Sequence, residues 1–108
     1  MSGITTHVLD ASVGRPGAGM HVRLEGPDGT VLGEGHTDAD GRIREFGPDR
    51  LRTGTHRLVF ATGAYFDARG QATFYPEVTL TFDVADPDEH YHVPLLLSPY
   101  AYSTYRGS

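Results

Sequence analysis

Alternation of apolar and polar residues over short segments is the feature of this chain that most constrains its fold. The clearest segment, residues 77–84, places Val78, Leu80, Phe82 and Val84 on one face and polar side chains on the other. Because successive side chains of a strand point to opposite faces, a period of two predicts a half-buried β-strand. The same period recurs in other segments, so the chain is expected to be all-β.

Turn sequences rich in glycine, proline and aspartate separate these segments. Asp28-Gly29, between two alternating runs, predicts a hairpin. A short helix is expected over Thr62–Arg69, where the alternation stops. The pattern predicts one β-sandwich domain, residues 1–108, with about eight strands. The strands are expected near residues 4–10, 20–26, 30–36, 42–46, 54–61, 77–84, 90–98 and 100–106.

Composition removes several classes of function. The chain has no cysteine, which excludes disulfides and thiolate catalysis. All 9 basic residues are arginines, which excludes a lysine nucleophile or Schiff base. A formal net charge of −5 argues against nucleic-acid binding. The first residues show no secretory signal and the longest apolar run, 93–97, is too short to cross a membrane, so a cytoplasmic protein without membrane contact is expected.

Two segments carry histidines where a solvent-facing surface would be expected. In residues 90–97, one face holds His90, His92, Pro94 and Leu96, opposite a regular apolar stripe. Imidazoles beside a leucine and a proline suit a partner interface or a lined groove, although a hairpin with surface histidines gives the same pattern. His7 alternates with apolar neighbours in the first predicted strand, and either a structural or a functional role fits it.

The same residues allow other chemistry. His90 and His92, with His7, are candidates for a metal site, but His-x-His without a third ligand at a diagnostic spacing is a weak signal. Arg42 and Arg44 share the face opposite Ile43, and alternation does not choose between them. The remaining histidines, His21, His36 and His56, are expected to be surface or structural residues.

Five motifs then follow one another along almost the whole chain. They are Thr-Thr-His-Val-Leu-Asp at 5–10 with Gly-Arg-Pro at 14–16, Thr-Asp-Ala-Asp-Gly-Arg at 37–42, Thr-Gly-Ala-Tyr-Phe at 62–66, Phe-Tyr-Pro-Glu-Val at 74–78, and the segment 90–108 ending in Tyr-Arg-Gly-Ser. In these motifs the chain resembles the 5-hydroxyisourate hydrolases, enzymatic relatives of transthyretin. Tyr100 and Ala101 stand where that family often has Phe and Gly.

The resemblance implies a fold, an assembly and a reaction. The fold is a transthyretin-like sandwich of two four-stranded sheets with a short helix. The assembly is a homotetramer, a dimer of dimers, with active sites at the interface between dimers. The reaction is hydrolysis of 5-hydroxyisourate to 2-oxo-4-hydroxy-4-carboxy-5-ureidoimidazoline, a step of urate degradation in purine catabolism. It requires no metal and no other cofactor.

The resemblance also implies the site residues, carried over motif by motif: His7, Arg42, His92, and the terminal Tyr105, Arg106, Gly107 and Ser108. A histidine can act as general base near neutral pH, so His7 and His92 are expected to orient and deprotonate the water, and which of them is the base stays open. Arg42 is expected to bind the ring carbonyls and stabilise the oxyanion. Tyr105, Arg106 and Gly107 are expected to bind the substrate, with Tyr105 holding the ring, and Ser108 or its carboxylate would join the catalytic network.

Two other functions compete with hydrolysis. A transthyretin-like carrier would bind a small apolar ligand in the same channel, but carriers of that kind lack the histidine pair and the terminal Tyr-Arg-Gly-Ser. An accessory β-sandwich domain with metal-binding histidines is the second rival. Metal analysis after chelation separates the latter, because the hydrolase is expected to be fully active without metal.

Overall fold

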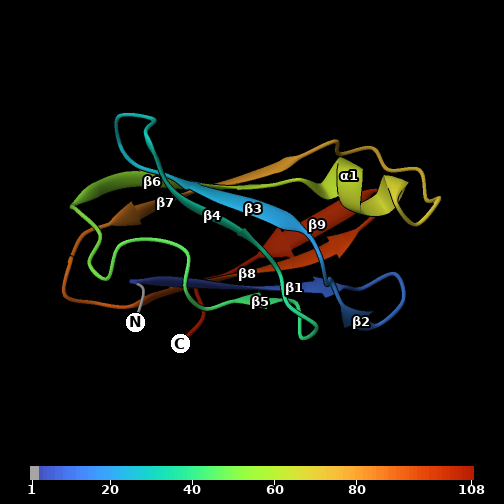
Figure 1. Ribbon diagram of the computed structural model, residues 1–108, viewed down its shortest axis with the longest axis horizontal. Helices are drawn as coiled ribbons and strands as arrows, with labels where there is room; N and C mark the ends of the chain where they lie inside the picture. The colour runs from blue at the N-terminus through green and yellow to red at the C-terminus, as the bar shows by residue number, and fades with distance from the viewer. Residues whose placement is uncertain (1–2) are drawn as a thin grey trace.

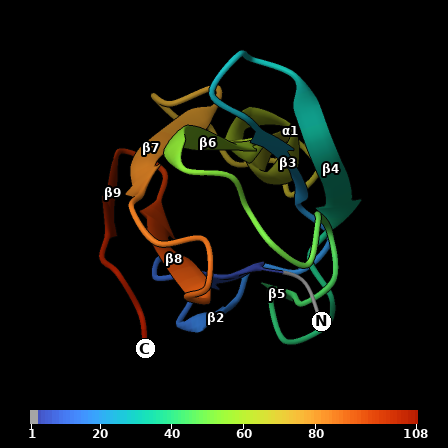
Figure 2. The ribbon, with the colours of Figure 1, turned by 90° about the vertical axis from the view of Figure 1, so that its left-hand side faces the viewer.

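Two β-sheets packed face to face form the molecule (Figures 1 and 2). The computed structural model describes residues 3–108, so the first two residues of the predicted domain, and part of the N-terminal segment searched for a signal, lie outside the described residues. Its elements are β1 (Ile4–Asp10), β2 (Arg15–Pro16), β3 (His21–Glu25), β4 (Val31–His36), β5 (Arg42–Ile43), β6 (Gly54–Phe60), α1 (Thr62–Asp67), β7 (Val78–Val84), β8 (Tyr91–Ser98) and β9 (Ala101–Thr104). The all-β sandwich predicted from alternation is confirmed.

The two sheets differ in the number and order of their strands. One has the order β4-β3-β6-β7, and the other has the order β2-β1-β8-β9 with β5 also paired to β1. Figure 2 shows β7 and β9, the last strands of the two sheets, on the same side of the sandwich. Helix α1 follows β6 and lies at one end of the sandwich (Figure 1).

The sheet that contains β1 has 5 strands rather than the 4 that the family resemblance implies. Two short strands share one edge of β1: β5 pairs Ile43 with Thr6, and β2 pairs Pro16 with Leu9. Each covers part of β1, so neither needs the length of a full strand. For the same reason the strand expected over 42–46 ends at Ile43.

The last predicted strand and the predicted helix are also shorter in the structure. β9 ends at Thr104 rather than at residue 106, because the tail turns back toward β8 and forms a bridge between Gly107 and His92. Helix α1 ends at Asp67, and its C-cap residue is Ala68.

The core consists of the inner stripes of both sheets. In β8 the predicted stripe is buried, with Tyr91 and Val93 under 10 % exposed and Leu95 and Leu97 fully buried at 0 %. A fully buried leucine contributes roughly 1.5–3 kcal/mol relative to an exposed one, so these side chains fix which face of β8 points inward. The opposite face of the strand, which carries His92, must then point outward.

Parallel pairing of β1 with β8 is the contact that positions the site. The register sets Thr5 opposite His92 and His7 opposite Pro94. β1 comes from the start of the chain and β8 from near its end, so this pairing joins segments that the sequence keeps far apart. The predicted hairpin at Asp28-Gly29 is confirmed as the antiparallel β3–β4 connection, with Gly29 at φ 84°.

His56 is the histidine of the core. Its side chain is 0 % exposed and its Nδ1 lies 3.0 Å from the carbonyl oxygen of Gly54, to which it donates a hydrogen bond. Its Nε2 is buried and has no hydrogen-bond partner among residues 3–108. His21 and His36 instead lie opposite each other on β3 and β4, with ring centroids 5.3 Å apart. His56 is thus structural, His36 is exposed at the surface and His21 is half-buried beside it, in line with the expectation of surface or structural residues. Within residues 3–108, no helix has the length and apolar character needed to span a bilayer.

Candidate active site

The outer face of the β5–β1–β8 region brings together side chains from three strands. His7 on β1 lies opposite Arg42 on β5, while Thr5, two residues earlier, lies opposite His92 on β8. Residues two apart on one strand, and residues opposite each other on neighbouring strands, project from the same face. His7, Arg42 and His92 therefore share one surface, and all three are half-buried.

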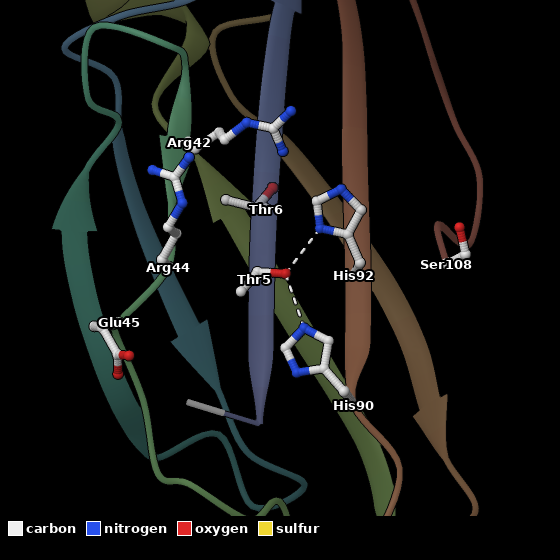
Figure 3. A pocket seen from close by; sticks show the side chains of 8 residues that line it. All are labelled: Thr5, Thr6, Arg42, Arg44, Glu45, His90, His92 and Ser108. Atoms are coloured by element: carbon white, nitrogen blue, oxygen red, sulfur yellow. Dashed lines mark hydrogen bonds between the residues drawn. The ribbon is translucent and has the colours of Figure 1, made fainter. Parts of the chain in front are cut away.

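A hollow of about 350 Å³ opens on this face (Figure 3). It is lined by Thr5, Thr6, Arg42, Arg44, Glu45, His90, His92 and Ser108. Cationic and imidazole side chains dominate this lining, which suits an uncharged or anionic ligand rich in carbonyl oxygens.

A second hollow, of about 150 Å³, lies on the same face of β1 and β8. It is lined by His7, Leu9, Pro94, Leu95, Leu96 and Tyr105. The predicted site residues are thus divided between two hollows: Arg42, His92 and Ser108 border the first, and His7 and Tyr105 border the second. The charges of Arg42 and His7 both act on His92, which links the two hollows electrostatically.

The C-terminal tail is held against β8 by its backbone. The N–H of Gly107 donates to the carbonyl oxygen of His92 at 2.8 Å, and the Thr104 hydroxyl donates to the carbonyl oxygen of Pro94 at 2.7 Å. A Cβ at position 107 would overlap the His92 ring, so only glycine allows this close approach. The approach brings Ser108 to the border of the larger hollow.

Arg106 points elsewhere. Its guanidinium lies 2.7 Å from the carboxylate of Glu89 and 4.7 Å from the ring centroid of Tyr91. It borders neither of these two hollows but a third one, between β7 and β8, which Tyr105 also borders. The structure therefore gives Arg106 an anchoring position for the tail.

Geometry separates the two arginines that alternation left together. The guanidinium of Arg44 donates to Asp38 at 2.9 Å. That of Arg42 has no hydrogen-bond or ion-pair partner among residues 3–108 and stays available to a ligand. The backbone N–H of Arg42 donates to the Asp38 carboxylate, and this bond is the largest cause that lowers the pKa of Asp38. Asp38 thereby fixes the backbone at Arg42 and draws Arg44 toward itself.

The hydrogen bond of His7 defines its tautomer. Its Nε2 lies 3.0 Å from the carbonyl oxygen of Asp40. A carbonyl only accepts hydrogen bonds, so Nε2 carries the proton. In the neutral ring, Nδ1 is then the acceptor. Asp40 precedes Gly41 and Arg42 in the tight turn that leads into β5, so one short segment orients His7 and presents Arg42.

His92 is kept neutral by its surroundings. Burial is the largest cause that lowers its pKa below the usual 6.5, and the charges of Arg42, His7 and His90 lower it further. Desolvation and nearby positive charge both disfavour the imidazolium form. At pH 7 the ring is therefore a neutral base.

Thr5 and His90 border the hollow, although neither of them was assigned a role in the hydrolysis from the sequence. The Thr5 hydroxyl lies 2.8 Å from Nδ1 of His92 and 3.0 Å from Nε2 of His90 (Figure 3). The sequence did contain a signal for both residues, because a spacing of two along a strand puts Thr5 on the same face as His7, and His90 on the same face as His92. The missing information was the pairing of β1 with β8.

The metal alternative concerns the same histidines. Among residues 3–108, no group of three or more His, Cys, Asp or Glu side chains is arranged to hold a metal ion. The hydrogen bonds of His90 and His92 converge on a threonine hydroxyl instead.

Known proteins resemble this chain over nearly all of its length. Residues 4–107 match the model of the HIUase/Transthyretin family. A 5-hydroxyisourate hydrolase of Caulobacter vibrioides is 49 % identical, with 100 % of each chain covered. The structure of Klebsiella pneumoniae 5-hydroxyisourate hydrolase superposes with a TM-score of 0.89 at 36 % identity, over 97 % of this chain and 92 % of that one. Sea bream transthyretin in complex with thyroxine gives a TM-score of 0.88 at 32 % identity, over 96 % of this chain and 93 % of that one.

Proposed function

The chain belongs to the HIUase/Transthyretin family, and we propose that within it this protein is an enzyme that hydrolyses 5-hydroxyisourate in urate degradation. The observation that carries the proposal is the polar face itself. A neutral His92, His7 and an Arg42 guanidinium that has no ion-pair partner among residues 3–108 gather on one sheet face with the C-terminal tail. A carrier for an apolar ligand has no use for a neutral base beside a free guanidinium.

The chemistry follows from these groups. His92 takes a proton from water as the water oxygen attacks a ring carbonyl carbon of 5-hydroxyisourate. The guanidinium of Arg42 stabilises the oxyanion that forms, a task suited to its fixed, permanently charged fork. The C–N bond then breaks, the ring nitrogen receives the proton from His92, and the ring opens to 2-oxo-4-hydroxy-4-carboxy-5-ureidoimidazoline. No cofactor takes part.

The remaining predicted residues bind or position. His7, oriented by the carbonyl oxygen of Asp40, helps to hold the water and substrate through its Nδ1, the acceptor nitrogen of the neutral ring. Tyr105 is 59 % exposed beside His7 and can contact the substrate ring. Ser108 adds a hydroxyl and a terminal carboxylate to the larger hollow. Gly107 and Arg106 serve the site by placing the tail.

We also propose that the site is completed by assembly into a homotetramer, a dimer of dimers. Leu9, Pro94 and Leu96 lie beside His7 on the outer face, an apolar set that a neighbouring subunit can cover. Strand β9 is a sheet edge whose residues are exposed, which suits strand pairing with a second copy. Light scattering at several concentrations tests the tetramer, and a monomer at assay concentration would refute it.

For the compartment we propose the cytoplasm, because a chain without cysteine needs no oxidising environment to fold. Cell fractionation with an antibody against the protein tests this directly. Recovery in a membrane or secreted fraction would contradict it.

The decisive experiment generates the substrate in place. Urate oxidase converts urate to 5-hydroxyisourate, and the decay of 5-hydroxyisourate is followed by absorbance with and without this protein. The proposal expects faster decay, undiminished after chelation of metals. Unchanged decay would refute it. As a second test, residues appended after Ser108 should impair turnover while thermal unfolding stays unchanged, since the tail borders the larger hollow.

A further inference from the structure

The Thr5 hydroxyl joins two imidazoles that lie on one face of the sheet. Its oxygen is 2.8 Å from Nδ1 of His92 and 3.0 Å from Nε2 of His90 (Figure 3). The parallel register places Thr5 directly opposite His92, and His90 lies one residue before β8 begins. Both distances are those of ordinary hydrogen bonds. One small side chain thus contacts both rings.

The number of protons available in this contact restricts which hydrogen bonds can form. A threonine hydroxyl has one proton to donate, so it can donate to only one of the two rings. If Thr5 donates to His92, the proton of neutral His92 must sit on Nε2. If Thr5 donates to His90, it accepts from His92, and the proton of His92 sits on Nδ1.

The second arrangement is favoured by charge. Nε2 of His92 lies on the side of the ring away from Thr5, where the hollow is bordered by Arg42 (Figure 3). The positive charge of Arg42 acts on His92 and opposes further positive charge there. A lone pair on Nε2 facing a guanidinium is electrostatically better than an N–H dipole facing it. The Thr5 hydroxyl occupies Nδ1, and Nε2 lies on the side of the ring that faces the hollow.

We propose that Thr5 and His90 are positioning residues that hold His92 in the tautomer with its proton on Nδ1. The chain of hydrogen bonds runs from His92 Nδ1–H to Thr5 Oγ1, and from the Thr5 hydroxyl to His90 Nε2. It leaves the lone pair of His92 Nε2 directed into the hollow. His90 acts only through Thr5, as an acceptor. The inference rests on the proposed function, in which His92 is the base.

The direction of the hydrogen bonds from His92 through Thr5 to His90 predicts different outcomes for similar substitutions. Thr5→Ser keeps the hydroxyl and Thr5→Val removes it at nearly the same volume. His90→Gln keeps an acceptor oxygen at about the reach of Nε2, and His90→Leu removes the acceptor. Loss of one hydrogen bond is worth up to about tenfold in an equilibrium or rate. We therefore expect kcat to fall about tenfold in Thr5→Val and His90→Leu. In Thr5→Ser and His90→Gln it should stay within about threefold of the original, with KM little changed in all four.

The tautomer itself is the readout that a merely structural role would not move. Nitrogen-15 NMR of the unliganded protein distinguishes protonated from unprotonated ring nitrogens. The original protein, Thr5→Ser and His90→Gln should show His92 with its proton on Nδ1, whereas Thr5→Val and His90→Leu should show a mixture or the Nε2–H form. His90 lies outside β8, so its pair of variants carries the test even if Thr5→Val does not fold.

Three results would overturn the inference. The first is an Nε2–H form of His92 in the original protein. The second is an unchanged tautomer and kcat in both Thr5→Val and His90→Leu. The third is a loss in His90→Gln as large as that in His90→Leu, because His90 would then be needed for more than accepting a hydrogen bond. If the original protein does not hydrolyse 5-hydroxyisourate, the proposed function fails while the tautomer measurement still decides the hydrogen-bond chain.

Discussion

On the outer face of the β4-β3-β6-β7 sheet, Arg23 is matched by a charge of opposite sign, whereas on the outer face of β5, β1 and β8 Arg42 and His92 are not matched by one among residues 3–108. Arg23 lies 2.7 Å from Glu25, and Glu25 lies opposite Arg57. Arg42 and His92 have no carboxylate partner among residues 3–108. Both faces belong to sheets with the same inner core, so folding alone does not require the difference.

The contrast shows which of the two faces has polar groups available to bind a ligand. Paired charges on one face satisfy each other and need only water beyond that. On the other face, Arg42 and His92 lack a carboxylate partner among residues 3–108 and are available to a ligand. Apolar Leu9, Pro94 and Leu96 lie beside them, on the surface that we propose a neighbouring subunit covers. The first face is thus a solvated exterior. The second is the face that we propose binds the substrate and contacts a neighbouring subunit.

Removing an imidazole should produce the largest difference in activity between variants of the two faces. His92→Ala and His7→Ala are each expected to lower kcat/KM by about 10²–10⁴, because general-base catalysis is lost or misaligned. The matched control is His21→Ala on the other sheet, which should leave kcat/KM unchanged. Steady-state assays with freshly generated 5-hydroxyisourate measure both. Activity of His92→Ala within a few-fold of the original would remove its role as base.

Replacing the arginine fork comes next. Arg42→Lys keeps the charge but loses the planar pair of donors, so kcat should fall by about 10²–10³. Arg23→Lys on the opposite face is the control and should have no effect on kcat. Equal activity of the two variants would show that Arg42 does not stabilise the oxyanion.

Displacing the tail should have a smaller effect. In Gly107→Ala, the added methyl group meets the His92 ring, so Ser108 is pushed away from the hollow. A misplacement of this size is expected to lower kcat by roughly ten- to a hundredfold. Gly35→Ala in β4 meets only ordinary contacts and serves as the control. Unimpaired turnover in Gly107→Ala would mean that the position of the tail does not matter for catalysis.

The pH profile tests the electrostatics of the reactive face. Burial and the neighbouring positive charges lower the pKa of His92, so it stays an unprotonated base to lower pH than a free histidine. Activity is lost as pH falls through this lowered pKa, and the midpoint of the acid limb of kcat/KM should therefore lie below 6.5. Arg42→Gln should move that midpoint upward, although activity is low. A midpoint above 6.5 would exclude His92 as the group observed.

Breaking an ion pair on the solvated face should have the smallest effect. Arg23→Ala removes a partly exposed pair with Glu25 and should lower the free energy of unfolding by under about 1 kcal/mol. Urea denaturation measures the loss, and kcat is expected to remain that of the original protein. A large loss of activity would show that the two faces are coupled.

The sequence alone was sufficient for much of the fold because strand signals are local. Period two in 77–84 and 90–97 identified the inner stripes, and Asp28-Gly29 identified a hairpin. The two-residue β2 escaped detection, because a strand so short has no period to read. The site residues came from motif resemblance rather than from alternation, which could not choose Arg42 over Arg44.

The sequence by itself determined which side chains face inward, because burial of a stripe depends on spacing along one strand. Only the tertiary structure decided which outward side chains meet. Thr5 reaches His92 across a separation of 87 residues, and Arg106 is drawn to Glu89 rather than into the hollow with Ser108. Such contacts depend on the pairing of whole strands and on where a turn directs the chain. They are set by the sum of all the packing in the sandwich, and no local pattern encodes that sum.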